Sequence, residues 1–158
     1  MSGRKRIRRS DILLKEKIKQ QIVNLIERER VDTFFVEELG GFENDAYDAV
    51  LELRSDFPQI KVVLVISKIS ELNRIETDES EYVSHLRYFD DFIYPDACAV
   101  GFKRWSIVYR NNYIVDNADF IIAYNRYKGR AYNFCKKAKN KNVVVIELYD
   151  EKNNLNKN

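Results

Sequence analysis

The chain has 158 residues, of which 45% are hydrophobic and 33% charged, as in ordinary soluble globular proteins, and its formal net charge is only +2. No apolar run approaches the roughly 18 residues that span a bilayer, and the basic N-terminus lacks the apolar core of a secretory signal. We therefore expect a cytoplasmic domain with no membrane segment. The small net charge gives no global argument for a nucleic-acid partner.

The cysteine and histidine content argues against a metal centre. The chain has two cysteines, Cys98 and Cys135, and one histidine, His85. Because no two cysteines are closely spaced, the pattern does not fit a structural zinc site, and we expect no metal. The cysteines are expected as reduced, buried thiols, and His85 as a surface residue.

The N-terminal region combines a basic tail, residues 1–10, with an amphipathic helix. After a cap at Ser10 or Asp11, apolar residues recur at helical spacing, which predicts a helix that ends near Arg30 and packs one face on a sheet. The residues of this stripe are Leu14, Ile18, Ile22, Leu25 and Ile26. Thr33–Val36 follows as a short β-branched and aromatic strand.

A glycine turn connects this strand to a second helix. Residues 37–44, EELGGFEN, contain the only paired glycines, Gly40 and Gly41, which allow left-handed backbone angles or close approach to a ligand. The helix that follows should end at Pro58. Its apolar residues are Ala46, Val50, Leu53 and Phe57. The branched run 61–67 then predicts a parallel strand covered on both faces.

The middle of the chain is less regular. Residues 68–88 are polar and are expected as a loop with a short helix beyond the strand ends. Residues 91–95 predict a brief strand or an extended lead-in. A helix follows, and the residues that share one of its faces are Phe102, Trp105, Val108, Tyr109 and Asn112.

The C-terminal third contains two more strands. The apolar run Phe120–Tyr124 predicts a buried strand, and a polar turn then leads to Gly129 and a last helix. The run Val143–Leu148 predicts the final strand. With residues 150–158 as a polar tail, we expect a single domain over residues 11–149.

The alternation of strands and helices predicts an α/β fold with a Rossmann-like three-layer α/β/α sandwich and a mostly parallel sheet. Ligands bind such sheets beyond the carboxyl ends of the strands. The elements that meet at this edge are Gly40, Gly41, the loop after Ser67, Asn125 and Gly129.

One segment identifies a resemblance. Arg110-Asn111-x-x-Ile114-Val115-Asp116-x-Ala118-Asp119, followed by an apolar strand, a glycine turn and a helix, resembles one branch of the SLOG superfamily. That superfamily contains the DprA-type DNA-processing proteins and the LOG-type nucleotide phosphoribohydrolases. The GGF turn and the Tyr-Pro before the Arg-Asn helix are similar too. The resemblance covers roughly residues 12–148.

The resemblance implies a nucleotide-like or other phosphate-bearing ligand at the strand ends. By position, Gly40, Gly41, Arg110, Asn111 and Gly129 would line the pocket. The residue chemistry agrees, because arginine offers a fork of donors that matches phosphate, and helix N-termini attract anions.

Each of these residues also has a purely structural interpretation. Arg110 can pair with Asp116 or Asp119 and tie the helix to the strand. Asn111 can cap a helix end, and each glycine can serve a turn alone.

The chain departs from the family pattern at three places. An apolar first strand and a Gly-His-Arg turn are replaced by SGRKRIRRSD, a Gly-Gly turn by Gly129-Arg130, and an acidic residue of the last helix by Lys136. In LOG-type enzymes a glutamate on that helix takes part in hydrolysis, so we do not assign this chain that reaction.

The first strand is therefore expected to be degenerate or missing between the Thr33 and Phe120 strands. Residues 3–9 can form an imperfect strand, the sheet can close around the gap, or the true start can lie upstream. We favour the upstream start, because the first helix keeps a full apolar stripe.

The expected function is binding or sensing of the ligand without efficient catalysis. An alternative is a LOG-type hydrolase, whose candidate acid or base is one of Glu37, Glu38, Glu43 and Asp45. These acidic residues can also simply favour a helix N-terminus.

A third hypothesis is a DprA-like nucleic-acid binder. It would use the basic N-terminal residues and the face of the last helix between Lys136 and Lys141, together with exposed tyrosines. The basic N-terminal residues are Arg4, Arg6, Arg8 and Arg9.

Overall fold

The computed structural model describes residues 9–37, 42–70 and 88–149. The helices in these ranges are α1 (Arg9–Glu29), α2 (Phe42–Leu53), α5 (Asp96–Val100), the 3-10 helix η1 (Lys103–Trp105), α6 (Ser106–Asn117) and α7 (Arg130–Asn140). The strands are β1 (Thr33–Val36), β2 (Lys61–Val65), β3 (Asp91–Ile93), β4 (Phe120–Ala123) and β5 (Val144–Glu147).

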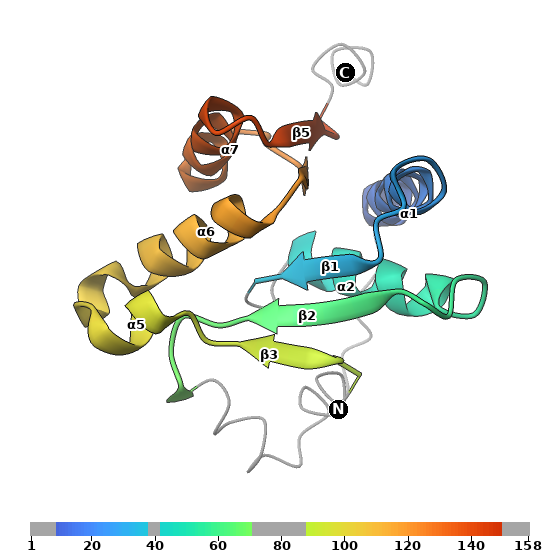
Figure 1. Cartoon of the computed structure of the whole chain (residues 1–158). Coiled ribbons are helices and arrows are strands. Elements are labelled where there is room, and N and C mark those ends of the chain that lie inside the picture. The colour runs from blue at the N-terminus through green and yellow to red at the C-terminus, as the bar shows by residue number, and fades with distance from the viewer. Residues whose placement is uncertain (1–8, 38–41, 71–87, 150–158) are drawn as a thin grey trace, which may run out of the picture.

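All strand pairs in the described residues are parallel, which confirms the predicted α/β class. The order in one sheet is β1-β2-β3, and β4 pairs with β5 in a second sheet (Figure 1). The central strand β2 buries every residue except Lys61, in agreement with a run that is apolar on both faces.

The main core forms between α1, α2 and the three-stranded sheet. The predicted stripe of α1 is buried at Ile18, Ile22, Leu25 and Ile26. Helix α2 begins at Phe42, four residues before the predicted stripe, and already ends at Leu53. The chain between Leu53 and Pro58 continues in turns, where the Phe57 N–H donates to the Leu53 carbonyl at 2.9 Å.

Helix α6 presents a different face to the interior than its apolar spacing predicts. The expected stripe is largely exposed. Phe102, which precedes η1, is 71% exposed, and Val108 in α6 is 42% exposed. The buried residues are Ser106, Arg110, Ile114 and Val115. The short helix α5, which the sequence pattern did not predict, precedes it and packs against α6.

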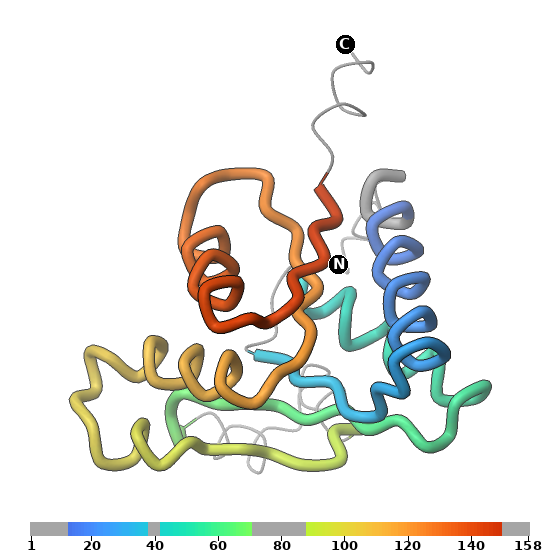
Figure 2. The backbone as a smooth tube through the Cα atoms, turned by 45° about the horizontal axis from the view of Figure 1, so that its top comes forward, coloured from blue at the N-terminus to red at the C-terminus, as the bar shows by residue number. Residues whose placement is uncertain are grey.

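The sheet is split where the sequence predicts a missing first strand. In Figures 1 and 2 the β4–β5 pair runs in a different direction from β1–β2–β3. Within the described residues, β1 has a strand neighbour only on its β2 side. A cavity of about 390 Å³ lies between β1 and β4, lined also by α1 and α2. Among the described residues, β1 and β4 are therefore not joined by a strand. Of residues 3–9, the candidate imperfect strand, Arg9 is the first residue of α1, and the others lie outside the described residues.

No helix of the described ranges is both long and apolar enough to cross a membrane.

Candidate functional site

Arg110 is the most buried charged residue of the described ranges, with 5% of the residue surface exposed. Helix α6 turns it inward, because Ser106, Arg110 and Ile114 recur every four residues on the buried face. Its Nη2 donates to Oε2 of Glu37 at 3.1 Å. Glu37 directly follows β1, so this contact brings α6 to the carboxyl end of that strand.

Asn111 and Arg110 are also in contact. Arg110 Nε and Nη2 lie 3.4 and 3.3 Å from the Asn111 Oδ1, which accepts from them. The sequence suggested Asp116 or Asp119 as a structural partner of Arg110. The structure shows an ion pair with Glu37, which was not expected. Asp116 instead pairs with Lys141, which follows α7, at 2.6 Å. The guanidinium is thus fixed between an amide oxygen and a carboxylate.

Glu43 completes this group from the first turn of α2. Burial raises the pKa of its carboxyl to about 7, the negative charge of Glu37 adds to the rise, and Arg110 partly offsets it. Glu37, Glu43, Arg110 and Asn111 are called the Arg110 cluster below. A carboxyl with a pKa near neutrality can hold or release a proton under physiological conditions.

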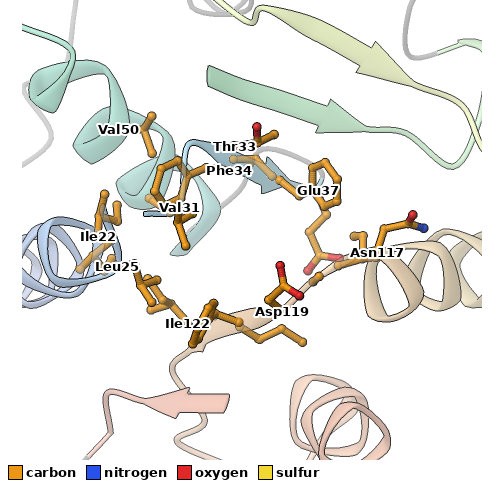
Figure 3. Close-up of a pocket in the computed structure, with 18 of the residues that line it drawn as sticks. Ile22, Leu25, Val31, Thr33, Phe34, Glu37, Val50, Asn117, Asp119 and Ile122 are labelled. Carbon is orange, nitrogen blue, oxygen red and sulfur yellow. The ribbon is translucent and has the colours of Figure 1, made fainter. Parts of the chain in front are cut away.

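The cavity between β1 and β4 adjoins this cluster. Glu37 and Glu43 belong to its lining, whereas Arg110, which contacts Glu37, does not. Figure 3 shows apolar side chains from α1, α2 and β4 around the cavity, such as Ile22, Val50 and Ile122. Polar groups thus meet an apolar space at the carboxyl end of β1, the combination typical of small-molecule sites.

A second polar contact closes the turn after β4. The Asn125 backbone N–H donates to Glu147 Oε1 at 2.9 Å, and its Nδ2 donates to Oε2 at 2.6 Å. The same Nδ2 lies 3.4 Å from the Cys135 sulfur. This turn therefore gains a fixed connection to β5, and Asn125 serves structure here.

Of the three predicted glycines, only Gly129 lies in the described residues. Gly40 and Gly41 lie outside them, between Glu37 and Phe42. Gly129 caps α7 with an extended φ of −121°, and an added Cβ there would meet nothing within 4 Å. Gly129 is also absent from the cavity lining. Neither observation supports its predicted role of lining the ligand pocket.

A family comparison now decides the classification. A model described as the YspA SLOG family matches residues 7–152, which include every helix and strand described above. The chain belongs to the YspA SLOG family. The resemblance seen in the Arg110–Asp119 segment is thereby confirmed. A search of curated proteins found no match.

The sequence did not predict that Glu37 and Glu43 would lie together in this candidate site. Glu37 and Glu43 were named only as possible acids or bases, and neither was expected beside Arg110. The available signal was positional: Glu37 directly follows a strand and Glu43 begins a helix, and both places lie at the carboxyl edge of a parallel sheet.

Proposed function

We propose that this SLOG-family domain binds a nucleotide-like, phosphate-bearing small ligand at the carboxyl end of β1, without efficient catalysis. The observation that carries the proposal is the Arg110 cluster beside the 390 Å³ cavity. That volume falls within the roughly 300–1,000 Å³ of small-molecule sites.

The cluster offers donors and acceptors that suit different parts of a nucleotide. The Arg110 guanidinium, which contacts Glu37 and Asn111, places a permanent positive charge next to the carboxylates that line the cavity, and this charge favours a phosphate there. The carboxylates of Glu37 and Glu43 can accept from ribose hydroxyls, as acidic residues do in dinucleotide-binding folds. The apolar side chains of the cavity suit the faces of a base.

The charge balance favours an anion below neutral pH. Glu43 is protonated in a large fraction of molecules at pH 7, because its pKa is raised to about 7. The cluster then carries one cation and one full anion, Arg110 and Glu37. A phosphate group meets less repulsion in this state than when Glu43 is ionised.

Isothermal titration calorimetry with a panel of mononucleotides tests the proposal. Replacing Arg110 with alanine should weaken binding of the best ligand by about 10- to 100-fold, roughly 1.5–3 kcal/mol, because it removes the positive charge that offsets Glu37 beside the cavity. Arg28→Ala, an exposed position on α1, is the matched control and should leave affinity unchanged. Equal affinities of wild type and Arg110→Ala, with both folded, would remove Arg110 from the site.

A second candidate function is hydrolysis of the bound nucleotide, with Glu43 as general base. Its pKa of about 7 is the value that such a base requires. The replacement of the helix acid by Lys136 argues against this reaction. The wild type should release free base from nucleoside monophosphates no faster than the Glu43→Gln variant does. A wild-type rate at least tenfold higher would establish catalysis instead.

A further inference from the structure

The C-terminal α/β region of the chain is strongly and one-sidedly basic. Between Phe120 and Ile146 the sequence has seven lysines and arginines and no aspartate or glutamate, although the whole chain has a net charge of only +2. All seven cationic side chains are exposed. The positive charge of this region is therefore concentrated on α7 and on the turns that flank it.

Some of these cations are used within the fold and others are not. Lys141 pairs with Asp116, and Lys137 donates to Asn112, so these two hold α7 against α6. Lys136 and Lys139 have no ion-pair partner within the described residues. With Tyr132 they recur at a spacing of four and three, so the three share one outward stripe of α7.

Exposed tyrosines are interleaved with these cations. Tyr127 is 75% exposed, and the Arg126 guanidinium lies 5.4 Å from the centre of its ring. Tyr132 is 38% exposed on the first turn of α7. We call the surface formed by Arg126, Tyr127, Lys128, Tyr132, Lys136 and Lys139 the Tyr127 face. Exposed large aromatic rings next to cations are typical of interaction surfaces.

We propose that the Tyr127 face binds single-stranded nucleic acid. Lysines and arginines neutralise successive phosphates, and tyrosine rings stack on bases without requiring a particular sequence. The backbone N–H groups at the start of α7 add positive potential beside Lys128. Single strands are favoured over duplexes, because only unpaired bases expose the faces on which tyrosines stack.

The size and composition of the face separate this partner from others. An eleven-residue α7 is about 16 Å long, and with its preceding turn it spans several nucleotides, more than one small ligand needs. An anionic membrane would be contacted by apolar side chains, but those of α7, such as Phe134 and Ala138, pack against the interior. Figures 1 and 2 both place α7 at the periphery of the molecule.

Fluorescence anisotropy with a labelled oligothymidylate of about 20 nucleotides tests the inference. The wild type should bind with a Kd of about 1–100 μM at physiological salt. Lys136→Glu combined with Lys139→Glu should weaken binding and reduce the slope of log K against log salt by about 1.4. Lys17→Glu combined with Arg28→Glu makes the same charge change on exposed positions of α1 and should have a much smaller effect.

The tyrosine gives the discriminating readout. Tyr127→Ala should weaken oligothymidylate binding by roughly 5- to 100-fold and leave the salt slope unchanged, because it removes stacking and no charge. Because Tyr127 is exposed, its replacement should not unfold the protein, and the circular dichroism spectra of the variant and the wild type should agree. Absence of binding at about 50 mM salt, equal binding by Tyr127→Ala, or equal affinity for duplex DNA or for phosphatidylserine vesicles would each overturn the proposal.

Discussion

Arg110 and Glu37 are 73 residues apart in the sequence and form an ion pair with 3.1 Å between Nη2 and Oε2. The arginine side chain is 6% exposed and the glutamate 34%. The pair links α6, which leads into the β4–β5 sheet, to the end of β1 in the other sheet. Because the two sheets share no strand pairing in the described ranges, this contact is one of the polar links between the two halves of the molecule.

Loss of Glu37 should destabilise the fold. Glu37→Ala leaves the buried Arg110 without this carboxylate, and we expect a loss of about 1–3 kcal/mol in the free energy of unfolding. The value lies below that of a fully buried pair because Glu37 keeps contact with solvent. Urea unfolding measures it. Glu52→Ala, which removes two solvent-accessible pairs, with Lys15 and Lys19, is the control and should cost under about 1 kcal/mol. Equal losses in the two variants would contradict this account.

Stability should fall as pH rises from about 4.5 to 7. The pKa of Glu43 is raised from 4.5 to about 7 in the folded protein, so the folded state binds more protons than the unfolded state across this window. A tenfold difference in proton affinity between the two states corresponds to about 1.4 kcal/mol, and partial exposure of the site reduces the total effect to about 1–2 kcal/mol. Urea unfolding at pH 5 and pH 8 should show this loss in the wild type and less of it in Glu43→Gln. If Glu43→Gln lost as much stability between pH 5 and pH 8 as the wild type, a group other than Glu43 would cause the loss.

Substitutions that border the cavity should cost less than those in the packed core. Ile22 lines the cavity and Ile66 does not, although both are buried. A side chain beside an existing void has fewer neighbours to lose, so we expect about 2 kcal/mol for Ile22→Ala and about 4 kcal/mol for Ile66→Ala. Chemical denaturation of both variants gives the comparison. A larger loss for Ile22→Ala would indicate that the space is filled in solution.

Both cysteines should react slowly with thiol reagents in the native state. Cys98 and Cys135 are free and buried, and burial raises the pKa of the Cys135 thiol. Ellman's reagent should therefore modify fewer than about one in ten thiols within minutes, and both at once after denaturation. Rapid modification of Cys135 in the folded protein would show that the turn at Asn125 opens readily.

The helices and strands of this fold were largely predictable because their patterns are local. The run Lys61–Val65 is apolar after its first residue, and the stripe of α1 repeats over several turns, so both follow from periodicity. Helix α6 shows where this fails. Val108 in this helix and Phe102 before it were expected to be buried and are exposed, whereas Arg110 is buried. Its charge is compensated by Glu37, which comes from a distant part of the chain.

The candidate site was predictable only in part, for the same physical reason. Arg110 and Asn111 followed from a local motif, whereas the pKa of Glu43 depends on burial and on Glu37, which only the folded chain sets. The place where the sheet splits followed from the missing apolar first strand. The patterns of β1 and β4 did not predict the split, since each has the pattern of a normal strand.

Native mass spectrometry of the purified protein tests the central claim most directly. We predict that wild type carries a co-purified mononucleotide-sized mass, which is released on denaturation and shows the ultraviolet absorbance of a nucleobase. Arg110→Ala, shown to be folded, should carry much less of it, and Arg28→Ala the same amount as wild type. If the wild type is free of ligand and no mononucleotide adds to it in titration, or if Arg110→Ala retains the full mass, the Arg110 cluster does not bind a nucleotide.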